Sequence, residues 1–257
     1  MDNGGPYRAL SLDLWFTLVY HTREDAAGWD RARIRVLQEF LERSAGPVLT
    51  ASDIEAGLGE VTSRLEAYGR SPVTTDPAVV LQEVANRLGA RVRGPAGVAA
   101  NAYSAAGLEE CPPRPNPEAF ELVRVLGRRG VPVVLVTNSS RRSVTWSDFL
   151  RTRDALSFRY VVSSSDLGVA KPDPAIFREA ARRVAVPPHQ LLHVGDRWEL
   201  DVAGARAAGL GAALYRGLWD RYPRDVYPDL PEPPAELPGT WVLDRLDPLL
   251  EPALWEA

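Results

Sequence analysis

The feature that most constrains the fold is the stretch from residue 9 to residue 18, in which an apolar run ends on a single carboxylate, Asp13. Apolar residues that follow Gly4-Gly5-Pro6 and precede polar sequence are typical of a buried parallel strand. An acid at the carboxyl end of such a strand is poorly placed for packing, whereas open α/β sheets bind their ligands at that edge. The stretch therefore predicts a buried strand whose end carries a chemically active acid.

The composition excludes several classes of protein. Of the 257 residues, 45% are hydrophobic and 25% are charged, which is ordinary for a soluble globular protein. The formal net charge of -4 and the lack of a basic stripe argue against nucleic acid as a partner. No apolar run approaches the roughly 18 residues of a membrane span, and the first residues lack the pattern of a signal peptide. Because the single cysteine, Cys111, also excludes an internal disulfide and a cysteine-rich zinc site, we expect a cytoplasmic protein that binds neither nucleic acid nor membranes.

One basic residue differs from all the others. Of the 30 basic residues, 29 are arginines and Lys171 is the single lysine. A compact ammonium on a flexible stem enters a tight anionic pocket that a planar guanidinium does not fit. Lys171 is therefore a candidate for an anion-binding site.

The N-terminal third of the chain and the remainder show different patterns. Apolar residues at helical spacing form four stretches between residues 22 and 109, without a convincing strand, which predicts a small helical bundle. After the proline-rich stretch 111–117, helices alternate with short apolar strands, which predicts parallel strands joined by right-handed crossovers. We therefore expect an α/β core domain formed by residues 1–20 and 111–257, with a helical domain inserted at residues 21–110.

Five polar residues lie at or just beyond the ends of the predicted core strands. Because parallel strands bring their carboxyl ends to one edge of a sheet, we expect these side chains to meet there: Asp13, Thr137, Lys171, Asp196 and Asp201. Mg²⁺ prefers oxygen ligands, including carboxylates, while an ammonium and a hydroxyl bind phosphoryl oxygens. A carboxylate oxygen that is free of the metal can attack phosphorus and form an aspartyl-phosphate. The set predicts a magnesium–phosphate site.

Four motifs resemble those of the haloacid dehalogenase-like (HAD) hydrolase superfamily and occur in the order of that family. They are Leu12-Asp13-Leu14-Trp15-Phe16-Thr17-Leu18, Val136-Thr137-Asn138, Gly168-Val169-Ala170-Lys171-Pro172-Asp173-Pro174-Ala175-Ile176-Phe177, and the run from His193-Val194-Gly195-Asp196 through Asp201 to Gly209. The resemblance covers about residues 7–20 and 115–218. It implies a Rossmann-like parallel sheet, the HAD-like fold, with an α-helical cap inserted between the first two motifs.

The resemblance also implies a role for each motif residue in a hydrolase that acts on a small phosphorylated metabolite. Asp13 and Lys171 would be the catalytic residues, with Asp13 as the nucleophile. The substrate would contact Thr137, Asn138, Lys171 and Trp15. The Mg²⁺ cofactor would be bound by Asp13, the backbone carbonyl of Trp15, Asp196 and Asp201.

Two positions depart from the family pattern. The second Asp of the first motif, which protonates the leaving group in family phosphatases, is Trp15 here, and the Gly that follows it is Phe16. An indole carries no titratable proton, and the loss of a general acid costs ~10²–10⁴-fold in rate unless another group replaces it. His21 lies just beyond the motif and could replace the missing acid, but its position at the start of a helix predicts a surface residue.

Three functions remain open on these residues. The first is a Mg²⁺-dependent phosphatase, favoured because the fourth motif retains Gly195-Asp196 and Asp201. The second is a metal-independent haloacid dehalogenase, because the dehalogenases of the family also carry an aromatic residue at the position of Trp15. The third is a phosphate-ligand binding protein with weakened catalysis. No sequence feature indicates the substrate or the oligomeric state.

Overall fold

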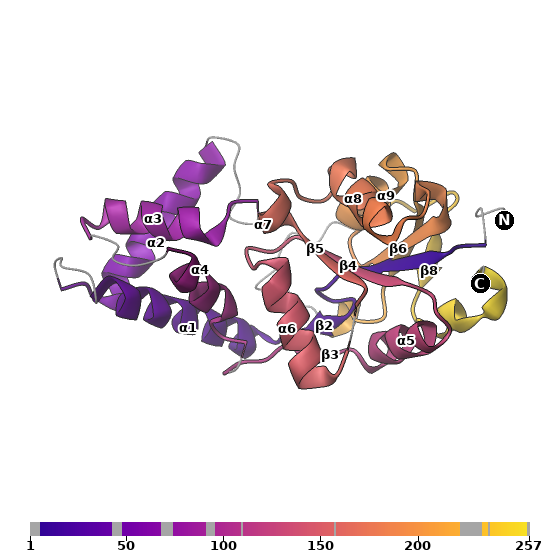
Figure 1. Ribbon diagram of the computed structural model, residues 1–257, viewed down its shortest axis with the longest axis horizontal. Coiled ribbons are helices and arrows are strands. Elements are labelled where there is room, and N and C mark those ends of the chain that lie inside the picture. The colour runs from indigo at the N-terminus through magenta and orange to yellow at the C-terminus, as the bar shows by residue number, and fades with distance from the viewer. Residues whose placement is uncertain are drawn as a thin grey trace.

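A six-stranded parallel sheet forms the centre of the larger part of the molecule (Figure 1). In spatial order the strands are β5 (Tyr160–Ser163), β4 (Val133–Thr137), β1 (Ala9–Leu12), β6 (Leu191–Gly195), β7 (Gly211–Tyr215) and β8 (Trp241–Leu243), and every neighbouring pair is parallel. From β1 the chain first builds the β4–β5 side and then returns to build the β6–β8 side. Strand β1 therefore lies at the point where open α/β sheets bind ligands, and the predicted α/β fold is confirmed.

The structure is a computed structural model, and it describes most of the chain. The described residues are 6–42, 48–67, 74–90, 96–108, 110–156, 158–221, 233–235 and 237–255. Segment 221–240 contains six prolines, which predict a surface excursion, but most of it lies outside these residues. Within the described ranges, every helix is too short or too polar to cross a membrane.

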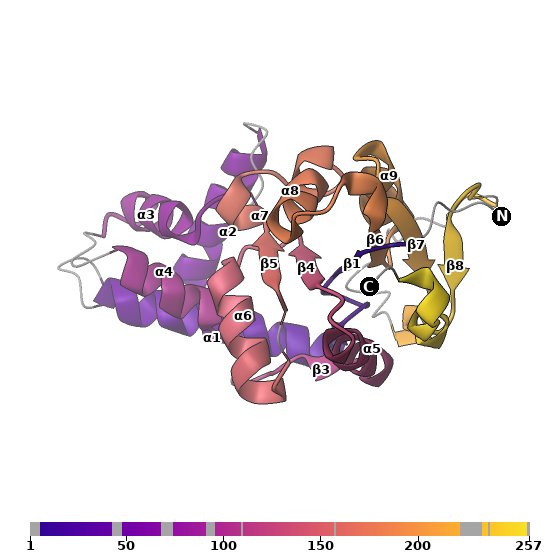
Figure 2. The ribbon, with the colours of Figure 1, turned by 45° about the vertical axis from the view of Figure 1, so that its right-hand side comes forward.

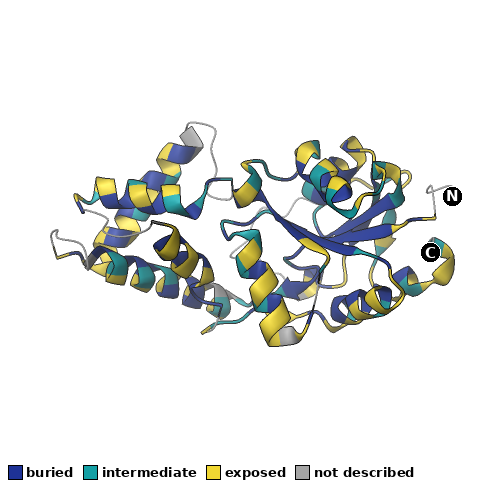
Figure 3. Cartoon of the chain, in the orientation of Figure 1, coloured by how far each residue is buried: buried dark blue, intermediate teal, exposed yellow. Residues whose placement is uncertain are grey.

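Helices cover both faces of the sheet, and each interface is apolar. One face packs against α5 (Pro117–Arg128) and α6 (Ser143–Asp154), the other against α8 (Pro174–Val184) and α9 (Ala203–Ala207). Alternate residues of β4 separate in the same way, because successive side chains of a strand point to opposite faces: Val133 and Leu135 face α5, while Val134 and Val136 face α8. Figure 3 shows the central strands buried and the outer faces of these helices exposed. Short helical segments complete the core: α7 (Ser164–Leu167), a π-helical turn at Trp198–Val202 and 3₁₀ turns at Pro188–Gln190, Trp219–Arg221, Asp247–Leu250 and Pro252–Leu254.

Two helices begin at Asp-Pro pairs. Asp173 caps α8 by accepting a hydrogen bond from the backbone N–H of Ala175 at 2.8 Å, and Asp76 caps α3 (Pro77–Arg87) in the same way. Proline at the first helical position needs no hydrogen-bond partner for its nitrogen, and its fixed φ suits a helix. The cap at Asp173 matters for the site, because it fixes the end of the loop that carries Lys171.

Four helices follow β1 and form the insert at one end of the molecule (Figure 2). They are α1 (Arg23–Glu42), α2 (Ala51–Ala67), α3 and α4 (Ala96–Ala105). Their apolar faces pack on one another in two clusters, centred on residues such as Leu37, Ile54 and Val84. In the described part of this insert, no strand joins the main sheet, as the sequence predicts.

A short ribbon connects the insert to the core. Strand β2 (Val19–Tyr20) enters the insert and pairs antiparallel with β3 (Arg114–Pro115), which leaves it. Nothing in the proline-rich stretch 111–117 predicts this pairing. Two-residue strands have no periodicity of their own, so only the contact between residues far apart in the chain reveals them.

Candidate active site

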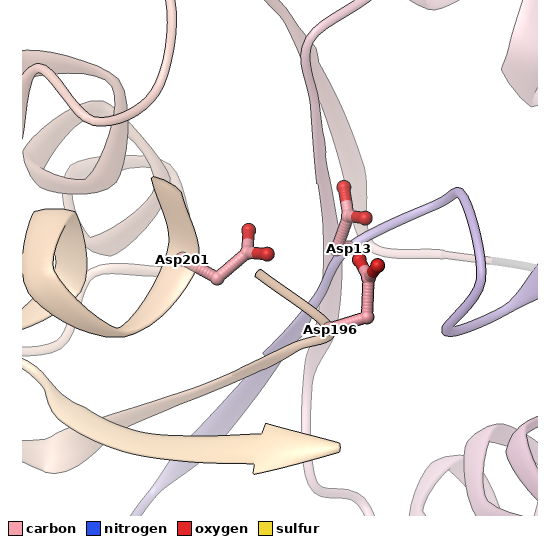
Figure 4. A group of neighbouring side chains, drawn as sticks. All are labelled: Asp13, Asp196 and Asp201. Atoms are coloured by element: carbon pink, nitrogen blue, oxygen red, sulfur yellow. The ribbon is translucent and has the colours of Figure 1, made fainter. Parts of the chain in front are cut away.

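Three buried carboxylates converge at the carboxyl edge of the sheet (Figure 4). Asp13 follows β1, Asp196 follows β6, and Asp201 lies in the π-helical turn beyond it. One oxygen from each lies within 4.8 Å of the others. The structure thus brings together the three acids that the sequence places at this edge.

Lys171 is the cation of this cluster. Its Nζ donates to Oδ1 of Asp13 at 2.5 Å and to Oδ1 of Asp201 at 2.6 Å. Burial opposes the charged form, but the two carboxylates outweigh it and raise the pKa of Lys171 above its usual range. The lysine is therefore held as an ammonium between two acids.

The cluster holds three acids and one ammonium. Burial raises the pKa of Asp13 and, more strongly, that of Asp196. Asp201 adds to both shifts, and Lys171 opposes both. For Asp201, burial is outweighed by Lys171, which lowers the pKa. Oδ2 of Asp196 is buried and has no hydrogen-bond partner among the described residues. An unpaired buried carboxylate oxygen is costly, and a divalent cation would satisfy it.

Asp201 is held by the backbone of its own turn. The N–H of Arg197 donates to Oδ2 of Asp201 at 2.9 Å. A Cβ at Gly195 would lie only 2.2 Å from Cγ of Asp201, so a side chain there is incompatible with this position. In the Gly195-Asp196 pair, Asp196 therefore contributes a carboxylate to the cluster, and the absence of a side chain at Gly195 leaves room for Asp201.

A buried serine–histidine pair contacts Asp201 of the cluster, and the sequence analysis does not predict it. Ser11 and His193 are partners across β1 and β6, and Oγ of Ser11 lies 2.9 Å from Nδ1 of His193. Nε2 of His193 lies 3.2 Å from Oδ1 of Asp201. Burial lowers the pKa of His193, which favours a neutral ring. The available signal was a polar residue inside each of two otherwise apolar strands.

Thr137 and Asn138 occupy the end of β4. The side chain of Thr137 is fully buried, and its Oγ1 makes no hydrogen bond within the described chain. Asn138 donates from Nδ2 to the carbonyl of Lys171 at 2.9 Å and accepts at Oδ1 from its N–H at 2.7 Å. Its amide therefore fixes the backbone of the lysine as well as lining the site.

Trp15, which replaces the second Asp of the first motif, packs against three aromatic rings. Its ring centroid lies 5.0 Å from that of Trp29, 5.7 Å from that of Trp146 and 4.9 Å from that of His21. Phe16, the second departure, has a φ of 55°, in the left-handed region that glycine adopts more readily. The turn after Asp13 therefore holds Phe16 in a conformation that is unusual for a residue with a side chain.

The expectation that His21 is a surface residue is wrong. Only 4% of it is exposed, because the rings of Trp15 and Trp29 enclose it. Burial is the main cause of its lowered pKa. The packing of α1 against the first motif, which no local pattern shows, accounts for the difference.

A cavity of about 450 Å³ opens above the cluster. Its core side includes Asp13, Lys171 and Asp196, and its other side includes Trp29 and Arg33 of α1. The helical insert therefore forms part of the wall of the site.

Comparisons with known proteins agree with this architecture. Residues 7–209 match the family model described as haloacid dehalogenase-like hydrolase. A glyceraldehyde 3-phosphate phosphatase from Methanopyrus kandleri is 37% identical over 120 residues, which are 45% of this chain and 51% of that protein. The chain thus spans about half the length of this curated relative.

Two solved structures share the fold over nearly the whole chain. A 2-haloacid dehalogenase from Pseudomonas syringae pv. Tomato DC3000 superimposes with a TM-score of 0.63 at 22% identity, covering 95% of this chain and 97% of the other. The HAD-hydrolase YfnB from Bacillus subtilis, bound to magnesium, gives 0.52 at 22% identity with the same coverage. Because the family model matches most of the chain, including all four motifs, this protein is a member of the haloacid dehalogenase-like hydrolase family.

Proposed function

We propose that this hydrolase is a Mg²⁺-dependent phosphatase that acts on a small phosphorylated metabolite through an aspartyl-phosphate on Asp13. The observation that carries the proposal is the buried cluster of three carboxylates with one ammonium, in which an oxygen of Asp196 has no partner among the described residues. Displacement at carbon by a carboxylate needs no cation. Excess buried negative charge beside a lysine favours a site for a divalent cation and a phosphoryl group.

In this proposal each acid has a separate task. Asp13, Asp196 and the backbone carbonyl of Trp15 would hold Mg²⁺, and Asp201 would bind the ion or its waters. The bound ion would neutralise charge on the phosphoryl oxygens. Lys171 and the hydroxyl of Thr137 would bind those oxygens, and Asn138 would keep Lys171 in place through its two backbone hydrogen bonds.

The reaction would proceed in two displacements. A carboxylate oxygen of Asp13 attacks phosphorus, the bond from phosphorus to the leaving-group oxygen breaks, and that oxygen leaves with the electron pair. Water then attacks phosphorus, and the bond from phosphorus to the Asp13 oxygen breaks with its electron pair on Asp13. The carboxylate is restored, the hydroxyl of the water stays on inorganic phosphate, and the second proton of the water passes to solvent. Trp15 offers no proton in either step, so the leaving group must depart on its own or take a proton from another group.

We further propose that residues 21–110 act as a cap domain on a core of residues 1–20 and 111–257. Two contacts between the parts support this. Nη2 of Arg142 donates to both carboxylate oxygens of Asp76, at 2.6 and 2.7 Å, and Arg33 of α1 donates to Ser140 of the core at 2.7 Å. Both contacts join the parts at or near the cavity.

Mg²⁺ is expected to stabilise the wild-type protein and not the Asp196→Asn variant. A ligand at 100 times its dissociation constant adds about 2.7 kcal/mol to the free energy of unfolding, because it binds only the folded state. Thermal unfolding of both proteins with increasing Mg²⁺ measures this effect. Asp30→Asn, at an exposed acid of the same cavity outside the carboxylate cluster, is the matched control and should keep the full shift. An equal shift in Asp196→Asn would remove the metal site from the proposal.

A further inference from the structure

Three arginines line the cavity. Arg197 pairs with Glu199, whereas the proposed chemistry at Asp13 does not use the other two. Arg33 comes from α1, and Arg141 comes from the loop before α6. Nη2 of Arg33 donates to Oγ of Ser140 at 2.7 Å, and Nη2 of Arg141 donates to the carbonyl of Ala106 at 2.9 Å. In each guanidinium, Nε is buried and has no partner in the described part of the chain.

The charges of these arginines are not paired locally. Neither forms an ion pair with any described acid, and only 4% of Arg141 is exposed. Burial lowers the pKa of Arg141 well below its usual range, and Arg33 lowers it further, while Asp30 opposes the shift. A buried guanidinium with an unused donor is costly unless an anion completes its hydrogen bonds.

Aromatic packing explains where Arg141 lies but not its unused donor. Its guanidinium carbon lies 4.5 Å from the ring centroid of Trp29 and 5.7 Å from that of Trp146. Such contacts stabilise a cation and fix its plane. They do not accept a hydrogen bond from Nε.

The carboxylate cluster does not balance the two arginines once a metal is bound. Three ionised carboxylates, one ammonium and one Mg²⁺ sum to zero charge, and the further acid of the cavity, Asp30, balances at most one of the two arginines, so a net positive region remains there. A phosphorylated substrate has its leaving group to place in that cavity. An anionic substituent on the leaving group would satisfy both guanidinium groups.

We propose that Arg33 and Arg141 bind a second anionic group of the substrate, carried by its leaving group. The inference rests on the proposed function, because it assumes that the phosphoryl group occupies the Asp13 end of the cavity. The preferred substrates are then phosphate esters whose leaving group bears a carboxylate or a second phosphate. Because Arg33 belongs to the insert and Arg141 to the core, this group is bound between the two.

Binding of non-hydrolysable analogues tests the subsite without requiring turnover. The probes are 4-(phosphonomethyl)benzoate and its neutral match, 4-(phosphonomethyl)benzamide, with the 3-substituted pair in parallel, titrated by calorimetry in the presence of Mg²⁺. Charge-assisted hydrogen bonds to the acid should make it bind roughly 10–100-fold more tightly than the amide for at least one pair. A second phosphonate in place of the carboxylate shows which anion is preferred.

Two variants test whether a preference for the acid over the amide depends on Arg33 and Arg141. In Arg33→Gln and Arg141→Gln the acid-to-amide affinity ratio should fall to nearly one. Arg35→Gln, on the same helix but paired with Glu110 at the surface, should keep the wild-type ratio. Arg33 is half-buried, so its variant keeps the test available if replacing Arg141 between two indole rings impairs folding.

Each outcome decides the inference. A wild-type ratio near one for both pairs would overturn it. A ratio that persists in Arg33→Gln and Arg141→Gln would also overturn it. This includes the case in which the arginines bind the phosphonate group itself, because the affinities for the acid and the amide would then fall equally and their ratio would stay unchanged. Hydrolysis of the matching aryl phosphates is measured separately: a preference for the acid without hydrolysis would retain the subsite and reject the phosphatase. Hydrolysis without a preference for the acid would retain the phosphatase and reject the subsite.

Discussion

Asp13→Asn is expected to abolish phosphate release, with a loss on the order of 10⁴–10⁶-fold in kcat. The amide oxygen cannot form the aspartyl-phosphate, and no other carboxylate of the cluster replaces it, because Asp196 and Asp201 are assigned to the metal. The measurement is the release of inorganic phosphate from phenyl phosphate by equal amounts of folded wild-type and variant protein.

The thermal stability of Asp13→Asn distinguishes the loss of the nucleophile from misfolding of the variant. Burial raises the pKa of Asp13, and Asp201 adds to this shift, although Lys171 opposes it; ionisation of Asp13 therefore opposes folding as the pH rises above the unfolded-state pKa. Asp13→Asn removes that cost and keeps the shape of the side chain, while Lys171 retains its contact with Asp201. The metal-free variant should therefore unfold at or above the wild-type temperature at pH 7. Activity close to that of the wild type would reject Asp13 as the nucleophile.

The hydrolysis rate should fall steeply as the pKa of the leaving group rises. Acyl and aryl phosphates release weakly basic anions, whereas alkyl phosphates release a strongly basic alkoxide that Trp15 cannot protonate. Introducing the missing acid by Trp15→Asp should raise alkyl phosphate hydrolysis by ~10²–10⁴-fold relative to its control and flatten the dependence. The measurement is kcat/KM for a series of phosphates of graded leaving-group pKa.

Trp15→Asn is the matched control for that experiment. It removes the same contacts with Trp29, Trp146 and His21 and leaves a side chain of the same shape without a titratable proton. A gain in Trp15→Asp over Trp15→Asn therefore reports the proton and not the repacking. A flat dependence in the wild type would show that another acid acts, and His21, buried beside Trp15, would be the first candidate.

The sequence is sufficient to predict the parts of the site that depend on local signals and sheet topology. Asp13, Asp196 and Asp201 follow short apolar strands, and parallel strands bring such residues to one edge. The helix starts at Asp76 and Asp173 depend only on a capping side chain and an adjacent proline, which are local features of the sequence.

The features that the sequence does not predict depend on contacts between distant segments. The burial of His21 requires the packing of Trp29 from α1 on the first motif. The Ser11–His193 contact depends on the register between β1 and β6. The position of Arg141 between two indole rings also joins separate elements, so no local periodicity indicates that it is buried.

The most direct test of phosphoryl transfer at Asp13 compares two products of the same protein preparation. Inorganic phosphate from phenyl phosphate and chloride from 2-chloropropionate are measured with Mg²⁺ and after removal of divalent cations by EDTA. We predict that phosphate is released only with Mg²⁺ and that chloride is released under neither condition. Chloride release by the metal-free protein, without Mg²⁺-dependent phosphate release, would contradict the proposed phosphatase and identify a dehalogenase.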